Sequence, residues 1–180
     1  QLVRIGVIDE SGYIRNAKEL RRMGVPVRIC QRVREDGEAG ERRILLSGEV
    51  LQKPVFLTAS DIRQLQLAKG AIRAGIETLL QKAQIPAKEL WRIYLTGSFG
   101  NSLSAEDVTG IGLLPEIEKE KITSVSSCAG MGAAMALLSG KVQRKMEEDA
   151  EKICHVELAG EPDFQERFLK EMNFPGNEVH

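Results

Sequence analysis

The fold is indicated first by residues 91–107, which read WRIYLTGSFGNSLSAED. Residues 91–95 form a short apolar run typical of a strand, and a glycine-containing turn follows at residues 96–101. Ser104 and Asp107 then have the spacing of a capping box that opens a helix. A strand, a glycine turn and a helix start in this order indicate an α/β domain.

The turn at residues 97–101 is a candidate ligand site. Gly97 and Gly100 lack a Cβ atom, so backbone amides can approach a ligand without steric interference. The turn has neither the Lys-Ser/Thr pair of a Walker loop nor the three glycines of a dinucleotide fingerprint, and on this pattern alone a plain tight turn is an equal alternative. Its position at the end of a strand, where α/β sheets bind ligands, favours the site.

A long amphipathic helix is predicted over residues 59–82, because apolar residues recur at three- and four-residue spacing from position 62 to position 80. Thr58 or Ser60 is expected to cap its first turn. We expect this helix to pack on a sheet that contains residues 91–95 and 122–125.

Two features of this helix bear on function. Gly70 and Gly75 each cost about 1 kcal/mol relative to alanine inside a helix, which predicts close packing of another backbone or a ligand there. Polar residues also follow one another at helical spacing as a stripe, which is either solvated surface or one wall of a site. The stripe consists of Arg63, Gln66, Lys69 and Arg73.

The rest of the chain alternates short strands and helices. An antiparallel meander is expected from strands at residues 25–33, 43–47 and 54–57. Beyond the glycine turn we predict a strand at 122–125, helices at 128–138 and 141–153, a strand at 154–158 and a helix at 163–172. The small residues that open the helix at 128 suit either an anion or, as the better interpretation, close packing on a sheet.

Composition excludes several classes of protein. The 25 basic and 26 acidic residues leave a formal charge of −1, so we expect no nucleic acid and no anionic lipid as partner. One local basic cluster is interpreted as a solvated edge: Arg21, Arg22, Arg28, Arg32 and Arg34. No apolar run has the length of a membrane span, and a soluble domain is expected.

The three cysteines, Cys30, Cys128 and Cys154, are odd in number and have no Cys-x-x-Cys spacing, which favours a reducing cytoplasm and free thiols without metal. No Ser-His-Asp set or carboxylate pair stands out, so no catalytic residue is assigned. The chain opens on QLVRIGVI without a methionine, and we expect it to be part of a longer protein.

Several segments together resemble the C-terminal part of the corrinoid-activating, ferredoxin-linked ATPases. These are DIRQLQLAKGAIRAGI at 61–76, YLTGSFGN at 94–101, IGLLP at 111–115 and VSSCAGMGA at 125–133. The resemblance continues through Val156 and Phe164 to Phe174-Pro175, and residues 7–12 look like the passage that follows the family's central phosphate-binding segment. It covers nearly the whole chain, most firmly from residue 55 onward.

The resemblance implies the ribonuclease-H-like C-terminal lobe of an actin-like ATPase domain, with a mixed sheet and flanking helices, as a single domain over residues 1–180. The family is similar to actin, sugar kinases and heat-shock chaperones. It implies ATP with Mg²⁺ as cofactor, and a 2Fe–2S ferredoxin domain, a linker and a first ATPase lobe outside these residues. The implied partner is the corrinoid protein of a methyltransferase system, whose Co(II) is reduced to Co(I) for methyl transfer; a homodimer is left open.

The resemblance also implies a nucleotide site. Gly97, Ser98, Phe99, Gly100 and Asn101 match the adenosine motif, while Gln66, Lys69 and Arg73 of the long helix face adenine and ribose. Ser126-Ser127 stands where many members have Gly-Asn. The phosphate segments of the family are not among these residues, so the chain alone is not expected to hydrolyse ATP.

Two other functions stay open at this point. The first is a noncatalytic module of actin-like fold for dimerisation or for docking to the corrinoid protein. The second is a lobe of a sugar or acetate kinase, although no sugar-binding acid is evident.

Overall fold

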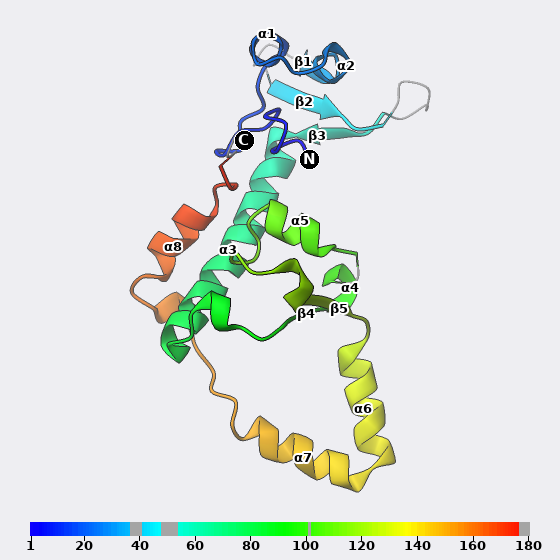
Figure 1. The fold of residues 1–180 in the computed structure, drawn as a ribbon, viewed down its shortest axis with the longest axis vertical. Helices are drawn as coiled ribbons and strands as arrows, with labels where there is room; N and C mark the ends of the chain where they lie inside the picture. Colours follow the sequence, from blue (N-terminus) through cyan, green and yellow to red (C-terminus); the bar gives the residue numbers. More distant parts are fainter. Residues whose placement is uncertain (37–40, 48–53, 101, 177–180) are drawn as a thin grey trace.

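The computed structural model describes residues 1–36, 41–47, 54–100 and 102–176. The long helix α3 runs from the three-stranded sheet towards the middle of the molecule, and α6 and α7 lie beyond its end (Figure 1). The N-terminal segment, α1, α2 and a three-stranded sheet lie at the start of α3, while α8 runs beside its later turns.

The N-terminal part forms the predicted meander. Strands β1 (Val33–Asp36), β2 (Glu41–Leu45) and β3 (Phe56–Thr58) pair antiparallel in the order β1-β2-β3. Helices α1 (Ala17–Arg22) and α2 (Val27–Cys30) precede them. The strand predicted over residues 25–33 was wrong, because Pro26 caps a helical turn there and its carbonyl oxygen accepts hydrogen bonds from the backbone of Ile29 and Cys30.

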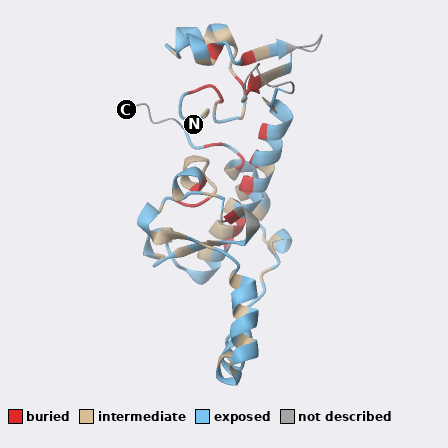
Figure 2. Ribbon diagram, turned by 90° about the vertical axis from the view of Figure 1, so that its right-hand side faces the viewer, coloured by how far each residue is buried: buried red, intermediate tan, exposed pale blue. Residues whose placement is uncertain are grey.

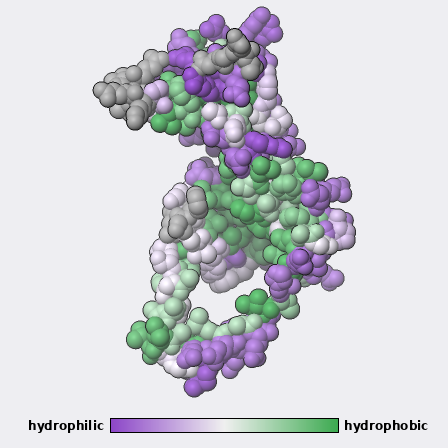
Figure 3. Space-filling view, turned by 180° about the vertical axis from the view of Figure 1, so that it is seen from behind, coloured by the Kyte–Doolittle hydropathy of each residue, from purple (hydrophilic) through white to green (hydrophobic). Residues whose placement is uncertain are grey.

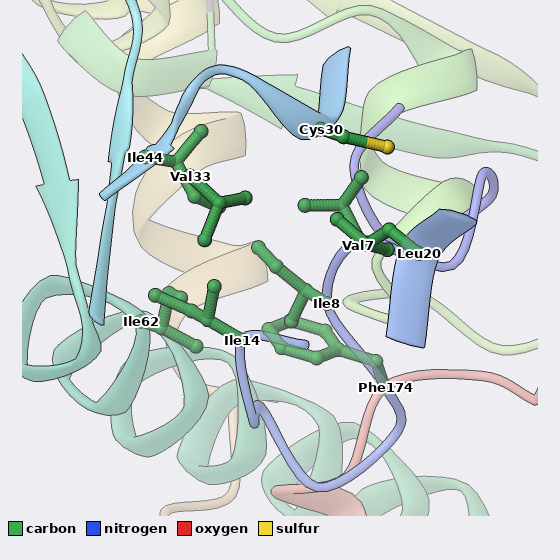
Figure 4. Packing of buried hydrophobic residues seen from close by; sticks show 9 residues of the cluster. All are labelled: Val7, Ile8, Ile14, Leu20, Cys30, Val33, Ile44, Ile62 and Phe174. Carbon is green, nitrogen blue, oxygen red and sulfur yellow. The ribbon is translucent and has the colours of Figure 1, made fainter. Parts of the chain in front are cut away.

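A hydrophobic cluster joins this part to α3 and to the C-terminal segment. Figure 4 shows side chains from the N-terminal segment, α1, α2, β1, β2 and α3 in one cluster, with the ring of Phe174, which is 4% exposed, at its edge. The cluster consists of Val7, Ile8, Ile14, Leu20, Cys30, Val33, Ile44, Ile62 and Phe174.

Helix α3 (Ala59–Ala83) begins and ends close to the predicted positions. Thr58 is the N-cap: its Oγ1 accepts from the backbone N–H of Asp61 at 3.2 Å, and the Asp61 carboxylate accepts from the Thr58 N–H at 2.8 Å. The hydrogen bonds that the backbone N–H and the hydroxyl of Thr58 donate to the Asp61 carboxylate lower the pKa of Asp61. Gln84 ends the helix in the left-handed conformation.

The two glycines inside α3 do allow close packing, as predicted. A Cβ atom on Gly70 would lie 3.0 Å from the Met172 side chain and 3.2 Å from its backbone nitrogen. A Cβ atom on Gly75 would lie 3.2 Å from Leu158. The partner at both positions belongs to the C-terminal region, which is why α3 makes its most extensive contact with α8. The expected packing of α3 on the strands at 93–96 and 122–125 is not among its main contacts.

A parallel pair follows α3 and the short helix η1 (Ala87–Glu89). Strands β4 (Ile93–Thr96) and β5 (Ile122–Val125) confirm both predictions and pair in parallel register. Between them lie α4 (Gly97–Gly100), α5 (Ala105–Gly110) and η2 (Lys119–Lys121). Ser104 caps α5 in the predicted box with Asp107. Parallel and antiparallel pairing are thus divided over two sheets.

Helices α6 (Cys128–Leu138) and α7 (Gly140–Ala150) pack on each other and extend away from the remainder of the chain (Figure 1). Neither helix has a buried residue, and both appear exposed or half-buried along their length (Figure 2). Leu137 and Leu138 are 88% and 87% exposed. In Figure 3 this end carries a hydrophobic cluster beside a broad hydrophilic face.

The chain returns to α3 through η3 (Leu158–Gly160) and α8 (Phe164–Glu171). The strand predicted at residues 154–158 was wrong: residues 154–157 have no regular structure, and none of the described strands pairs with them. Among the described residues, no helix is long and apolar enough to cross a membrane.

Candidate functional site

The glycine turn lies at the carboxyl end of β4, as predicted, and is coiled into the four-residue helix α4. Gly97 has a φ of +88°, a left-handed conformation that favours glycine, and a Cβ atom built there would meet no heavy atom within 4 Å. The backbone at Gly97 therefore borders open space, which leaves room for a ligand.

Gly100 is required for a different reason. A Cβ atom at this buried position would lie 2.9 Å from the carbonyl carbon of Leu95, so the turn folds back on its own strand. The predicted contributions of the Ser98 and Phe99 side chains and of Asn101 lie outside the described part of the chain.

The start of α6 is placed at the same edge as this turn. Because β4 and β5 are parallel, their carboxyl ends meet there, and α4 packs on both strands. Ser127, the residue before α6, has a φ of +54° and makes no side-chain capping bond. The sheet edge thus presents two backbone turns, one at Gly97 and one at Ser127.

The polar stripe of α3 is mostly buried. Gln66 is 3% exposed, and its Nε2 donates to the carbonyl oxygen of Ser11 at 3.0 Å. A Cβ atom on Gly12, which has a φ of +85°, would lie 2.7 Å from the Gln66 side chain. Gln66 therefore holds the turn at residues 11–12 against the helix, while Arg63 at the start of the stripe is exposed.

Lys69 is a buried cation held by the C-terminal segment. It is 1% exposed, its Nζ donates to the carbonyl oxygen of Asn173 at 2.5 Å, and it lies 5.8 Å from the centre of the Phe174 ring. Burial lowers the pKa of Lys69, Glu171 acts in the opposite direction, and Arg73 adds to the lowering.

Arg73 ends the stripe one turn further on. Its Nη2 lies 2.8 Å from Glu77 Oε1, and its Nε lies 3.7 Å from Glu171 Oε2, which is too long for a hydrogen bond. The Nε atom is buried and has no hydrogen-bond partner in the described chain. An unsatisfied guanidinium N–H of this kind is suited to an acceptor atom on a ligand.

Lys69 and Arg73 line one cavity of about 420 Å³ between α3, α8 and the loop after α5. Its lining includes charged residues, Glu116, Lys170 and Glu171, and apolar ones, Leu114, Pro115, Phe174 and Pro175. Of the predicted site residues that the structure describes, only Lys69 and Arg73 line this cavity; Gln66, Gly97 and Gly100 do not.

Sequence reasoning missed the C-terminal members of this cavity. Glu171 and Asn173 determine the charge and the hydrogen bonding of Lys69 and Arg73, yet they lie about a hundred positions further along the chain. The sequence feature that could have pointed to this C-terminal segment is Gly70, whose missing side chain makes room for Met172.

No cysteine is among the residues that line the cavity at Lys69 and Arg73 in the described chain. Cys30, Cys128 and Cys154 are free, and they are buried, half-buried and exposed in that order. Within the ranges that the structure describes, no three His, Cys, Asp or Glu side chains are grouped as a metal ion requires.

Comparison with known proteins matches the whole chain. Residues 1–180 match a family described as the C-terminal domain of RACo, the ASKHA domain. A solved structure named as a reductive activator for corrinoid, iron–sulfur protein is similar at a TM-score of 0.77 and 33% identity, over 99% of this chain and 27% of that one. The actin-like α/β fold expected from the sequence is thereby confirmed.

Two curated proteins are also similar. The corrinoid activation enzyme RamQ of Eubacterium limosum is 34% identical over 136 residues, which cover 75% of this chain and 23% of RamQ. The [Co(II) methylated amine-specific corrinoid protein] reductase of Methanosarcina barkeri is 26% identical over 133 residues, covering 72% of this chain and 24% of the reductase. The chain thus spans about a quarter of the length of these relatives.

Proposed function

The chain belongs to the family of C-terminal ASKHA domains of RACo, and from this premise we propose that it is the C-terminal ATPase lobe of a reductive activator of corrinoid proteins. The full-length protein would use ATP to drive the transfer of one electron to an inactive Co(II) corrinoid, which gives the Co(I) state that accepts a methyl group. The observation that carries this proposal is the similarity of 99% of the chain, in fold and in sequence, to a reductive activator.

The nucleotide would bind through two groups of residues. Backbone amides of the turn at 97–101 would approach the ribose and the α-phosphate, since the space beside Gly97 is open. Arg73 would meet the nucleotide from α3, because its Nε is buried without an acceptor. Gln66 and Lys69 belong to the same proposed site, and their present bonds to Ser11 and Asn173 make them positioning groups for its walls.

The remaining cofactors and partners follow from the same proposal. Mg²⁺ would arrive with the ATP phosphates, which are its usual ligands. A 2Fe–2S cluster needs about four thiolates, so we place it in other residues of the full-length protein. The proposed partner is the corrinoid protein of a methyltransferase system in the cytoplasm. Homodimer formation stays a prediction, which sedimentation of the intact protein would test.

Titration calorimetry of the intact protein with ATP tests the nucleotide site through a matched pair of glycine variants. Gly97 and Gly24 both have a left-handed φ, and a Cβ atom on either would meet nothing within 4 Å. Each change to alanine therefore costs the fold about 1 kcal/mol of backbone strain. Gly97→Ala should raise the dissociation constant for ATP about tenfold and slow the ATP-dependent reduction of Co(II), whereas Gly24→Ala should leave both unchanged.

Equal ATP affinity in the two variants would remove the assignment of the turn. If the intact protein bound sulfate as tightly as ATP, the noncatalytic docking module would become the better description of this lobe. Loss of ATP affinity in Arg73→Met, with an unchanged melting temperature, would further support the α3 wall of the site.

A further inference from the structure

The positive charge of this chain is concentrated in one short stretch. Residues 15–34 contain seven basic residues and a single acidic one, Glu19, although the whole chain has a formal charge of −1. The remainder of the chain is therefore clearly acidic. This stretch folds into α1, α2 and the start of β1, at one end of the molecule, where hydrophilic surface gathers (Figure 3).

Five cations at this end are exposed and point to a surface that can bind another molecule. We use the name basic patch for the exposed side chains of Lys18, Arg21, Arg22, Arg28 and Arg32. In the described part of the chain, no carboxylate lies within ion-pair distance of any of them. Glu19 is occupied, because its carboxylate accepts from the backbone N–H of Asn16 at 2.7 Å.

The basic patch borders a hollow. Arg28 and Arg32 line a depression of about 450 Å³ together with Gln31, Arg34 and Leu45. Its lining combines the apolar Leu45 with guanidinium groups, which bind carboxylates with two parallel hydrogen bonds. A depression of this kind accepts a projecting acidic side chain, whereas a bilayer surface is flat.

Exposed apolar side chains lie within the same surface. Met23 at the end of α1 is 53% exposed and Val27 at the start of α2 is 57% exposed. Arginine and methionine are both enriched at protein–protein interfaces, where apolar contacts add to charge pairing. A nucleic-acid backbone would gain nothing from these two apolar side chains.

We propose that the basic patch is a docking surface for a protein partner that presents clustered Asp and Glu side chains. The charges would steer the approach of the partner, and the hollow beside Arg28 and Arg32 would receive one of its carboxylates. None of the patch residues lines the cavity at Lys69 and Arg73, so this surface goes beyond the proposed nucleotide site.

The test compares two charge reversals of equal size in the intact protein. Arg28→Glu with Arg32→Glu alters the patch, and Lys141→Glu with Arg144→Glu alters exposed, unpaired cations of α7 in the described chain. The probe is poly-L-glutamate, measured by biolayer interferometry at an ionic strength of about 0.01 M and of about 0.1 M, where the screening length falls from about 30 to about 10 Å. The patch variant should weaken binding about tenfold and the control by less than about twofold.

Wild-type affinity should also fall at the higher ionic strength. Equal binding by the two charge-reversal variants would overturn the docking surface. Tighter binding of the wild type to phosphatidylserine vesicles or to duplex DNA than to poly-L-glutamate would overturn the choice of a protein partner. ATP affinity and melting temperature are measured in the same samples and should not differ between the variants. If the patch variant weakened binding to poly-L-glutamate as expected but the wild type did not bind ATP, the nucleotide site would be contradicted and the docking surface would stand.

Discussion

The amine of Lys69 is buried inside the domain, and its titration affects the free energy of unfolding. Burial lowers its pKa in the folded state below the ordinary value of 10.5. Between the two pKa values the unfolded chain binds more protons than the folded one, so the free energy of unfolding rises with pH across that window.

We therefore expect the wild type to gain stability relative to Lys69→Met as the pH rises towards 10.5. Urea unfolding over this pH range measures the difference, and Lys141→Met, which removes an exposed lysine, is the control. Parallel pH profiles for the wild type and Lys69→Met would contradict a lowered pKa.

Single residues also mark the limit of sequence prediction for the site. The stripe Gln66, Lys69 and Arg73 could be read from helical spacing, because neighbours on one helix are fixed by its geometry. Their partners Ser11 and Asn173 could not, since the bonds join positions separated by 55 and 104 residues. Whether a polar side chain meets solvent, ligand or backbone depends on such distant segments.

At the scale of the element, α3 depends on its first turn. Thr58 makes both bonds of the capping box with Asp61, whereas Ser60 lies inside the helix and makes no capping bond. Thr58→Ala should lower the free energy of unfolding by about 1 kcal/mol, and Ser60→Ala should change it little.

Chemical denaturation at neutral and acidic pH checks this prediction. The pKa of Asp61 is lowered in the folded state, so its contribution is present at neutral pH and is lost as the pH falls through that pKa. The effect of Thr58→Ala should shrink accordingly. An equal loss of unfolding free energy in Ser60→Ala would contradict the assignment of Thr58 as the N-cap.

Elements with strong local signals could be predicted, and those set by their neighbours could not. Capping boxes and apolar spacing located α3 and α5. Helix α1 was not predicted, although Asn16 and Glu19 form a capping box. The β-branched residues around Pro26 and those at 154–158 favour strands, but a strand needs a partner, and none lies beside either segment in the described chain.

At the scale of the whole molecule, α6 and α7 expose apolar side chains that water disfavours. The 180-residue chain by itself should therefore self-associate, and replacing Leu137 and Leu138 by glutamate should make it more monomeric. Sedimentation velocity at several concentrations measures this. Lys141→Glu adds the same negative charge without removing an apolar side chain and is the matched control. A wild type that is monomeric at every concentration would contradict the prediction.

The position of Phe174 also has a consequence during synthesis on the ribosome. Its ring completes a cluster that otherwise comes from residues 7–62, and its backbone N–H donates to the carbonyl oxygen of Glu10 at 2.9 Å. Translation must therefore reach position 174 before the early hydrophobic residues are covered. Until then Val7, Ile8 and Ile14 stay within reach of chaperones, because the hydrophobic cluster lacks Phe174 while residues 63–173 are still being made.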